Sequence, residues 1–471
     1  MSEYERFLST KRLVSPPVGI PDPGPLCPMM FPFQNDVTRW ALKRGRAALW
    51  MDCGTGKSPC AIEWARTVAA HTGKPVLILT PLAVAQQFVT EGAKFGSLVK
   101  LCRDASHVEH PSADHSGVNV TNYDRLEKFD TSVFGGVVLD ESSILKDYTS
   151  ATRNALIAAF ETTPFKLCCT ATPAPNDHVE LGNHAEFLGV MSRTEMLSMF
   201  FCHDGGETQT WRLKGHAQRD FWRWVCSWAV NLRKPSDLGY SDEGYDLPPL
   251  IIHEHVVKAG AEYAQKMGTL FAMDAHGLTD QRAARRASLE ERVAVAAQIA
   301  NAEPDEYWLA WCDLNAESQA LSSSITGAVE VTGSMTVDMK ERLIGAFTAR
   351  DLHALVSKPS IAGWGVNWQH CARVLFVGLS NSFEAWYQAI RRTWRFGQTR
   401  EVHCHVITSE AEGAVVANLK RKQRDNEKLS AGMVEHMAEI TRAELGATGR
   451  TFVGYNPEHR IVIPHWLVGG P

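Results

Sequence analysis

The sequence predicts an α/β fold built from two lobes in tandem, each a parallel β-sheet flanked by helices. Three observations support this prediction. Short apolar or β-branched runs alternate with helical patterns between residues 31 and 190, a second set of such runs follows between residues 307 and 407, and a glycine-rich turn comes directly after the first run. The chain of 471 residues is long enough for two or three domains and a large core.

The individual strands are predicted from apolar and β-branched runs of strand length. In the first lobe, the predicted strands are residues 47–51, 76–80, 118–121, 137–140 and 166–170. In the second lobe, they are residues 307–313, 354–357, 372–377 and 402–407. Because these runs alternate with helical segments, both sheets are expected to be parallel.

The chain divides into four predicted segments. They are an extended, proline-rich arm (1–30), a first lobe (31–246) with an aromatic helical insertion at about 190–246, a second lobe (247–410) with a helical lead-in at 255–303, and a C-terminal helical tail (411–471). Pro248 and Pro249 mark the boundary between the two lobes.

Two segments allow more than one interpretation. The insertion carries the aromatic residues Phe200, Phe201, Trp211, Phe221, Trp222, Trp224 and Trp228. A helical packing element is favoured over an aromatic platform for nucleic acid. The tail carries the basic residues Lys420, Arg421, Lys422 and Arg424. A solvated helix face is favoured there over a contact with backbone phosphates.

The turn after the first predicted strand has the composition of a phosphate-binding loop. Its residues are Gly54, Thr55, Gly56, Lys57 and Ser58. In such a loop, backbone N–H groups surround the phosphates, the lysine reaches the β- and γ-phosphates, and the hydroxyl holds Mg²⁺. Met51 stands where the full eight-residue pattern requires glycine. The shorter pattern that remains also fits an ordinary strand–turn–helix corner, so it needs partner motifs.

Two carboxylates supply such a partner. Asp140 and Glu141 come at the end of the apolar run 137–140. Because strand ends of a parallel sheet meet at one edge, we expect both acids to face the same crevice as Lys57. Asp140 would hold Mg²⁺ through water, and Glu141 would orient and polarise the attacking water. The alternative is an acidic turn that merely ends a strand.

A cluster of arginines in the second lobe offers a further partner. Arg391, Arg392 and Arg395 lie in one predicted helix, where Arg392 and Arg395 share a face. Most such clusters are surface features. If the second lobe presents them to a nucleotide held by the first, their guanidinium groups would neutralise charge on the γ-phosphate.

The composition and net charge limit which cellular environments and binding partners are expected for the protein. The net charge of −5 requires any nucleic-acid site to be a local basic surface. The eleven cysteines contain no CxxC pair, which predicts buried thiols in a reducing compartment and neither disulfides nor zinc. The sequence has no apolar stretch approaching 18 residues, so we expect a cytoplasmic protein without membrane association.

Taken together, residues 31–407 resemble the superfamily 2 helicases and, within them, the Swi/Snf-type double-stranded DNA translocases. The segment from Gln388 to Gln398 is similar to the family pattern QAxxRxxRxGQ, the most specific match after the glycine-rich turn. The other motif-like segments follow the family's order: Phe33-Gln34, Thr80-Pro81-Leu82, Thr121-Asn122-Tyr123, Asp140-Glu141-Ser142-Ser143, Thr170-Ala171-Thr172-Pro173, and 363–367.

This resemblance implies two tandem RecA-like P-loop NTPase lobes with ATP and Mg²⁺ as cofactors. It assigns hydrolysis to Lys57, Asp140, Glu141, Arg392 and Arg395, and metal binding to Ser58 and Asp140. It assigns nucleotide binding to Gln34, which would read adenine, and to Gly54, Thr55, Gly56, Lys57, Ser58, Gly365 and Gln388. Pro81, Asn122, Thr170 and Thr172 would contact nucleic acid or couple hydrolysis to movement.

The implied activity is ATP-dependent movement on duplex or branched DNA in replication, recombination or repair. Binding would be sequence-tolerant and salt-sensitive, because it would depend on phosphate contacts. Compact relatives occur in bacteriophage genomes, in which case the location is the host-cell cytoplasm. The sequence identifies no protein partner.

Departures from the family pattern leave two alternatives open. Ser142 and Ser143 replace the usual residues after the acidic pair, and residues 378–381 lack an acidic residue that relatives carry. These departures motivate a nucleotide-gated module that remodels DNA or a protein with weak hydrolysis. The other alternative is an RNA-dependent ATPase or helicase, against which the QAxxRxxRxGQ form argues.

Overall fold

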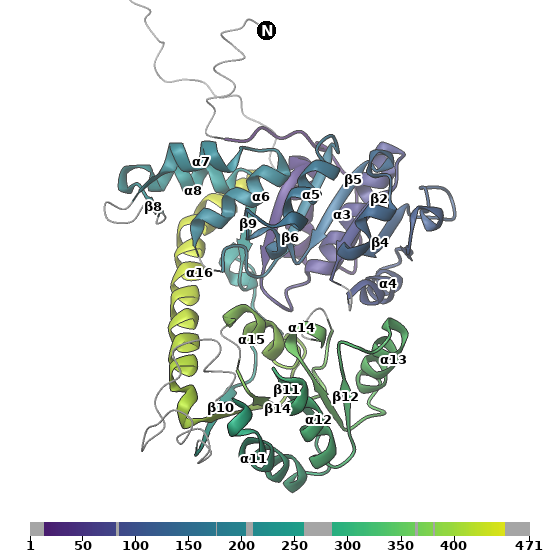
Figure 1. The fold of residues 1–471 in the computed structure, drawn as a ribbon. Coiled ribbons are helices and arrows are strands. Elements are labelled where there is room, and N and C mark those ends of the chain that lie inside the picture. The colour runs from purple at the N-terminus through teal and green to yellow at the C-terminus, as the bar shows by residue number, and fades with distance from the viewer. Residues whose placement is uncertain are drawn as a thin grey trace, which may run out of the picture.

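The computed structural model describes residues 14–81, 84–175, 177–203, 211–258, 285–362, 366–379 and 382–447. Two α/β lobes lie one above the other, and a long helix runs along one side of both (Figure 1). Each lobe contains its own parallel sheet. The predicted fold class, two tandem RecA-like lobes with parallel sheets, is therefore confirmed.

The first sheet has seven parallel strands in the order β3-β4-β2-β5-β6-β1-β9. The strands are β1 (Arg46–Met51), β2 (Val76–Thr80), β3 (Val99–Leu101), β4 (Val118–Asn122), β5 (Gly136–Asp140), β6 (Phe165–Thr170) and β9 (Ala229–Leu232). Five of these match the predicted runs, whereas β3 and β9 were not predicted. The central strands are buried on both faces, which explains their nearly continuous apolar sequences.

Helices cover both faces of the first sheet. They are α2 (Pro32–Arg44), α3 (Lys57–Thr72), α4 (Ala85–Lys94), α5 (Ala151–Ala159), α6 (Leu181–Leu188), α7 (Arg193–Phe200) and α8 (Gln218–Cys226). Side chains of α2, α3 and α4 form one apolar core with the sheet, and side chains of α5 to α8 form another.

The aromatic segment belongs to the second of these cores. Phe221, Trp222 and Trp224 of α8 are buried, as is Trp228, which precedes β9. The packing interpretation is therefore supported, because buried rings cannot stack on bases. The segment also differs from a pure insertion, since its β9 extends the main sheet beside β1. A short antiparallel hairpin, β7 (Phe201–His203) with β8 (Trp211–Leu213), projects from it.

The second sheet has six parallel strands in the order β10-β15-β14-β11-β13-β12. The strands are β10 (Leu250–Val257), β11 (Trp308–Cys312), β12 (Ala328–Val331), β13 (Ala354–Ser357), β14 (Arg373–Val377) and β15 (Val402–Ser409). The helices are α11 (Leu289–Ala302), α12 (Asn315–Ser324), α13 (Val337–Thr348), α14 (Pro359–Ala362) and α15 (Phe383–Ile390). The helical lead-in was expected to begin at residue 255, but the chain is still in strand β10 there and remains in it to Val257. Residues 259–284 of the expected lead-in lie outside the described residues.

The described part of the tail forms one helix, α16 (Gly413–Ala447), as its polar sequence predicts, and residues 448–471 of the tail lie outside the described residues. It leaves the second lobe after β15 and ends against the first lobe (Figure 1). Met433 and Met437 enter the core of the first lobe, and Glu444 pairs with Arg44 at 2.5 Å. The helix therefore connects the two lobes along one side. Among the described residues, none of the helices combines the length and apolar character required to span a bilayer.

All eleven cysteines lie in described parts of the chain as free thiols. Burial raises the pKa of Cys60 and of Cys404 to about 12, so both stay protonated near neutral pH. The prediction of buried thiols is supported for most of them.

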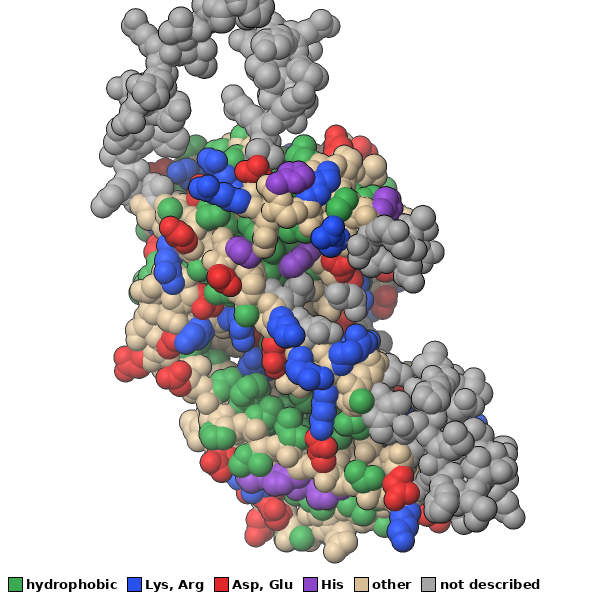
Figure 2. All heavy atoms as spheres, turned by 90° about the vertical axis from the view of Figure 1, so that its left-hand side faces the viewer, with side chains coloured by type: hydrophobic (Ala, Val, Ile, Leu, Met, Phe, Trp, Pro, Cys, Tyr) green, Lys and Arg blue, Asp and Glu red, His purple; other side chains and the backbone are tan. Residues whose placement is uncertain are grey.

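Four histidines stack across the outer strands of the second sheet, where Figure 2 shows a band of histidine side chains on the lower lobe. His253 and His255 come from β10, and His403 and His405 from β15. The rings of His253 and His405 lie 4.5 Å apart, and Nε2 of His253 lies 3.0 Å from Nδ1 of His403. Burial, followed by the charges of the three neighbouring histidines, lowers the pKa of His405 to about 4.

We expect acid to weaken this sheet edge. An imidazole whose pKa is lower in the folded chain than in the unfolded chain contributes stability above the unfolded pKa of 6.5, and this contribution is lost as the pH falls towards 4. His405→Asn should therefore reduce the fall in Tm between pH 7 and pH 5 by about 2 °C. Thermal unfolding followed by circular dichroism measures this. The exposed His216 offers a control, His216→Asn, and an equal pH dependence in the two variants would contradict the prediction.

Candidate functional site

The glycine-rich turn joins β1 to α3 through two left-handed residues. Gly54 has φ +90° and Gly56 has φ +94°, which side chains other than glycine rarely tolerate. A Cβ at Gly54 would lie 2.9 Å from Cβ of Phe396 in the second lobe. A Cβ at Gly56 would lie 2.1 Å from Nε2 of Gln34. The turn is therefore tightly enclosed, and the second lobe contacts it directly.

Lys57 opens helix α3, and its ammonium group folds back over the turn. Nζ of Lys57 donates to the carbonyl of Met51 at 2.8 Å and to that of Asp52 at 3.4 Å. The hydroxyl of Thr55 donates to the same carbonyl of Asp52 at 2.7 Å. Ser58 follows Lys57 in the first helical turn. A cation, a hydroxyl and the amino end of a 16-residue helix thus meet at one point, which suits an anion.

Gln34 holds the turn from the side of α2. Its Nε2 donates to the carbonyl of Thr55 at 3.0 Å, and its Oε1 accepts from the backbone N–H of Phe31 at 3.0 Å. The side chain therefore uses both ends of its amide within the protein. It lines the cleft, and its expected role in reading adenine stays a prediction.

The acidic pair lies at the end of β5, as its sequence predicts. Asp140 and Glu141 are 5% and 7% exposed, and Glu141 adopts a left-handed backbone with φ 53°. Oε2 of Glu141 is buried and has no hydrogen-bond partner among the described residues. Burial, then the charge of Glu141, raises the pKa of Asp140 to about 8, although Lys57 and Arg392 oppose this increase. Two buried acids side by side suit a divalent cation and a water molecule.

The two arginines of the second lobe reach the same cleft. Nε of Arg392 donates to the carbonyl of Gln388 at 2.8 Å, and its Nη2 donates to Oε1 of Gln388 at 2.7 Å. Nη1 of Arg395 donates to the carbonyl of Val366 at 3.3 Å, while its buried Nε has no partner in the part of the chain that the structure describes. Burial, then the charge of Arg392, lowers the pKa of Arg395 to about 10, which leaves it charged at neutral pH.

One cavity of about 270 Å³ between the lobes brings most of the predicted residues together. Its lining includes Gln34, Gly54, Gly56, Lys57, Ser58, Asp140, Glu141, Arg392 and Arg395. Thr55 and Gln388 lie behind it, because each is hydrogen-bonded to a lining residue. Gly365 lies outside the described residues.

The predicted coupling and nucleic-acid residues line other cavities. Pro81 and Asn122, at the ends of β2 and β4, line a cavity of about 440 Å³ that Glu384 of the second lobe also lines. Thr172, after β6, lines a separate cavity of about 390 Å³. Thr170 is buried and accepts a hydrogen bond from the backbone N–H of Thr172 at 3.1 Å. The four residues therefore do not line one common cavity.

A buried hydrogen bond compensates for one departure from the family pattern. The hydroxyl of Ser142 lies 3.1 Å from Nε2 of His184 on helix α6. Burial lowers the pKa of His184 to about 4, so this imidazole is neutral at physiological pH. Ser142 thus fixes the segment after the acidic pair against the core of the first lobe.

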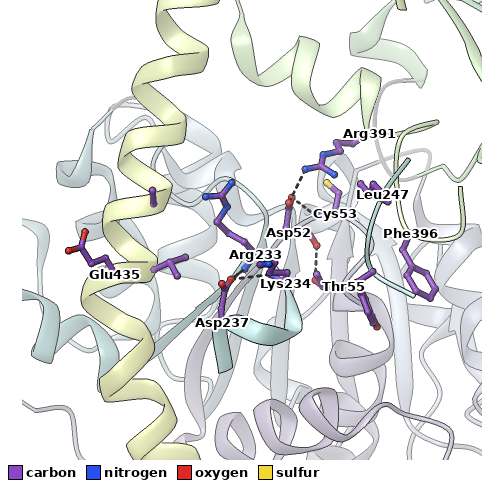
Figure 3. Close-up of a pocket in the computed structure, with 13 residues that line it drawn as sticks. Asp52, Cys53, Thr55, Arg233, Lys234, Asp237, Leu247, Arg391, Phe396 and Glu435 are labelled. Atoms are coloured by element: carbon purple, nitrogen blue, oxygen red, sulfur yellow. Dashed lines mark hydrogen bonds and ion pairs between the residues drawn. The ribbon is translucent and has the colours of Figure 1, made fainter. Parts of the chain in front are cut away.

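Sequence reasoning missed a group of residues between the lobes. Asp52, directly after β1, pairs with Arg391 at 2.9 Å and accepts a hydrogen bond from Tyr387 at 2.5 Å. The close-up in Figure 3 shows Arg391 reaching towards Asp52 and Phe396 beside the turn. The one available signal was the third arginine of the cluster, since Arg391 lies outside the face that Arg392 and Arg395 share.

No protein-family model matches the chain. Over 161 residues, or 32% of the chain, it is 29% identical to the SWI/SNF-related matrix-associated actin-dependent regulator of chromatin subfamily A-like protein 1 of Xenopus laevis. The match spans only about a sixth of that relative's length, or 16%. This similarity confirms the predicted resemblance to Swi/Snf-type ATPases of superfamily 2.

A solved structure, the SWI2/SNF2 ATPase core of Sulfolobus solfataricus in complex with dsDNA, is similar at 17% identity with a TM-score of 0.42. The alignment covers 90% of this chain and 97% of the other. A score this low does not carry the fold assignment, which follows from the strand order described above.

Alanine substitutions at the two glycines that flank α3, Gly56 and Gly73, test whether the turn is as tightly enclosed as described. Gly73 ends the helix at φ +64° with no atom near its missing Cβ, whereas Gly56 begins it beside Gln34. Gly73→Ala should lower the free energy of unfolding by about 1 kcal/mol, the cost of left-handed backbone. Gly56→Ala should cost at least about 2 kcal/mol, because it adds a steric clash. Urea unfolding followed by circular dichroism measures both.

The same experiment separates backbone strain from the clash. Gln34→Ala removes the obstructing amide, so Gly56→Ala should cost less in a Gln34→Ala background than in the unaltered chain. Equal costs for the two glycine variants would show that the turn is not enclosed as described.

Proposed function

We propose that the chain is a nucleic-acid-stimulated ATPase that uses ATP hydrolysis between its lobes to move along duplex or branched DNA. The observation that carries the proposal is the shared cleft. Lys57 and the carboxylates of the first lobe face the same cavity as Arg392 and Arg395 of the second. A triphosphate held there would be bound by one lobe and neutralised by the other.

The residues of the cleft fit ATP and Mg²⁺. Lys57 and the backbone N–H groups at the start of α3 would hold the phosphates, and Ser58 with Asp140 would hold the metal ion. When bound, Mg²⁺ supplies positive charge that offsets the charge of the phosphates. Oε2 of Glu141, which no described residue contacts by a hydrogen bond, would accept a proton from water and orient that water. Nε of Arg395, likewise without a partner among the described residues, would donate to a developing charge.

Movement would follow from the position of the site. Because the cleft lies between two rigid α/β lobes, a ligand that binds both lobes favours their approach, and its loss permits their separation. The ends of β2 and β4, with Pro81 and Asn122, lie beside the cleft and would contact the DNA backbone. The process served, whether replication, recombination or repair, is part of the proposal.

The first test compares ATP turnover with different nucleic acids. We expect duplex or branched DNA to stimulate turnover more strongly than structured RNA. Glu141→Gln should lower kcat by about 100-fold or more while ATP still binds, because the base is lost but the phosphate site is intact. Asp130→Asn, an exposed acid of the same lobe, is the matched control.

Two outcomes would contradict this proposal in different ways. Stimulation by RNA alone would favour an RNA-dependent ATPase. Turnover in the unaltered protein that is no higher than in Glu141→Gln would favour a nucleotide-gated remodelling module.

The second test concerns the arginine of the second lobe. Arg395→Ala should lower kcat by about 100-fold or more and change ATP affinity less, because its charge is needed most as the phosphate bond breaks. Arg400→Ala is the control, since Arg400 is exposed and pairs with Glu306 away from the cleft. Steady-state kinetics and equilibrium binding measure the two effects. An unchanged kcat in Arg395→Ala would remove this residue from the active site.

A further inference from the structure

We propose that Asp52 is a positioning residue that joins the phosphate-binding turn to the second lobe through Arg391 and Tyr387. The inference rests on the proposed function, because it concerns how the same cleft is assembled. It assigns to Arg391 a role different from that of Arg392 and Arg395. Because Asp52 also contacts Lys57, the position of Lys57 would depend on whether the second lobe is docked against the first.

The contact is close and largely shielded from water. Nη2 of Arg391 lies 2.9 Å from Oδ2 of Asp52, and the phenol of Tyr387 donates to Oδ1 at 2.5 Å. The side chains of Arg391 and Asp52 are 11% and 18% exposed. Each carboxylate oxygen thus has its own donor from the second lobe. Because the contact is shielded, solvent screens it less than an exposed ion pair.

Arg391 is held in place from several sides. Its guanidinium lies 4.6 Å from the centre of the Trp394 ring and 5.1 Å from that of Tyr387. Burial alone would lower the pKa of Arg391, but Asp52 and Tyr387 outweigh it and raise the pKa above its ordinary value. Asp52 supplies the carboxylate for this buried cation. Removing Asp52 would leave the charge buried without its counter-ion, which is unfavourable.

The same aspartate supports the phosphate-binding turn from within the first lobe. Its carbonyl accepts from Nζ of Lys57 at 3.4 Å and from the hydroxyl of Thr55 at 2.7 Å. Its Oδ1 also accepts from the backbone N–H of Cys53 at 2.7 Å. One residue therefore contacts the second lobe through its side chain and the catalytic lysine through its backbone.

Arg391 and Arg392, although adjacent in the sequence, contact different parts of the molecule. Arg391, at the end of α15, points to Asp52, whereas Arg392 bonds Gln388 and Val366 and lines the cleft. Helix α15 ends at Ile390, so the predicted helix does not include the three arginines, which lie in the turn segment that follows it. Within that segment, Arg391 contacts the phosphate-binding turn and Arg392 lines the cleft. Docking of the segment on Asp52 then sets the position from which Arg392 and Arg395 face the phosphates.

A double-mutant cycle tests this coupling. The variants are Asp52→Asn, Arg391→Gln and their combination, measured as kcat and KM for ATP with duplex DNA and as the Kd of a fluorescent methylanthraniloyl ATP analogue. We expect each single variant to lower kcat/KM about 10-fold or more, and the double variant to be no worse than the worse single variant. Arg391→Lys should restore part of the activity, because it restores the charge.

The pair Arg373–Glu303, at 2.7 Å on the second lobe, supplies the control, because neither residue lines the cleft. Glu303→Gln and Arg373→Gln should leave kcat/KM unchanged. Thermal unfolding identifies variants that lose structure. If Asp52→Asn does not fold, Tyr387→Phe removes a single hydrogen bond to the same carboxylate and replaces it in the cycle.

The outcomes distinguish this inference from the proposed function. Effects of Asp52→Asn and Arg391→Gln that multiply in the double variant, or a change below twofold in either, would overturn the inference while leaving the ATPase intact. If the unaltered protein binds ATP but hydrolyses none, the proposed function fails and the affinity cycle alone decides the inference. If no ATP binds, both are overturned.

Discussion

The site depends on one steric constraint, the close packing of the turn between β1 and α3. Gly54 and Gly56 follow left-handed paths, and Phe396 and Gln34 occupy the space that side chains at these positions would need. Because Phe396 belongs to the second lobe and Gln34 to α2, the turn is where three parts of the chain meet. Its shape consequently fixes the distance at which the lobes approach. The positions of the charged residues around it follow from this distance.

Charge balance complements this packing. Asp140 and Glu141 bring two buried acids to the cleft, and the second lobe brings the buried Arg392 and the half-buried Arg395. Within the second lobe, Arg292 pairs with Glu317 at 2.8 Å, both fully buried, and Arg285 pairs with Glu412 at 2.9 Å. Buried charges of this kind require fixed partners, since an unpaired one is costly. These pairs hold β15 and α12 in a rigid scaffold behind the arginines.

Much of the fold and part of the site could be predicted from local sequence. The turn and the acidic pair follow apolar strands directly, so their positions at the sheet edge required only the order of the elements. Strand β3 was missed because it has three residues, and β10 because histidine and glutamate interrupt its apolar pattern at the sheet edge. The pairing of Asp52 with Arg391 could not be predicted, because these residues are 339 positions apart and meet only when the lobes are placed.

Helix α16 restricts how the lobes can move. It starts shortly after the end of β15, and its C-terminal half is packed into the first lobe through Met433, Met437 and Leu445. A straight helix of 35 residues is about 52 Å long and resists stretching. Helix α16 therefore lies along one side of the molecule and is attached to both lobes. Because α16 is fixed to both lobes along one side, we expect any relative displacement of the lobes to be largest on the opposite side, where α4 and α13 lie (Figure 1).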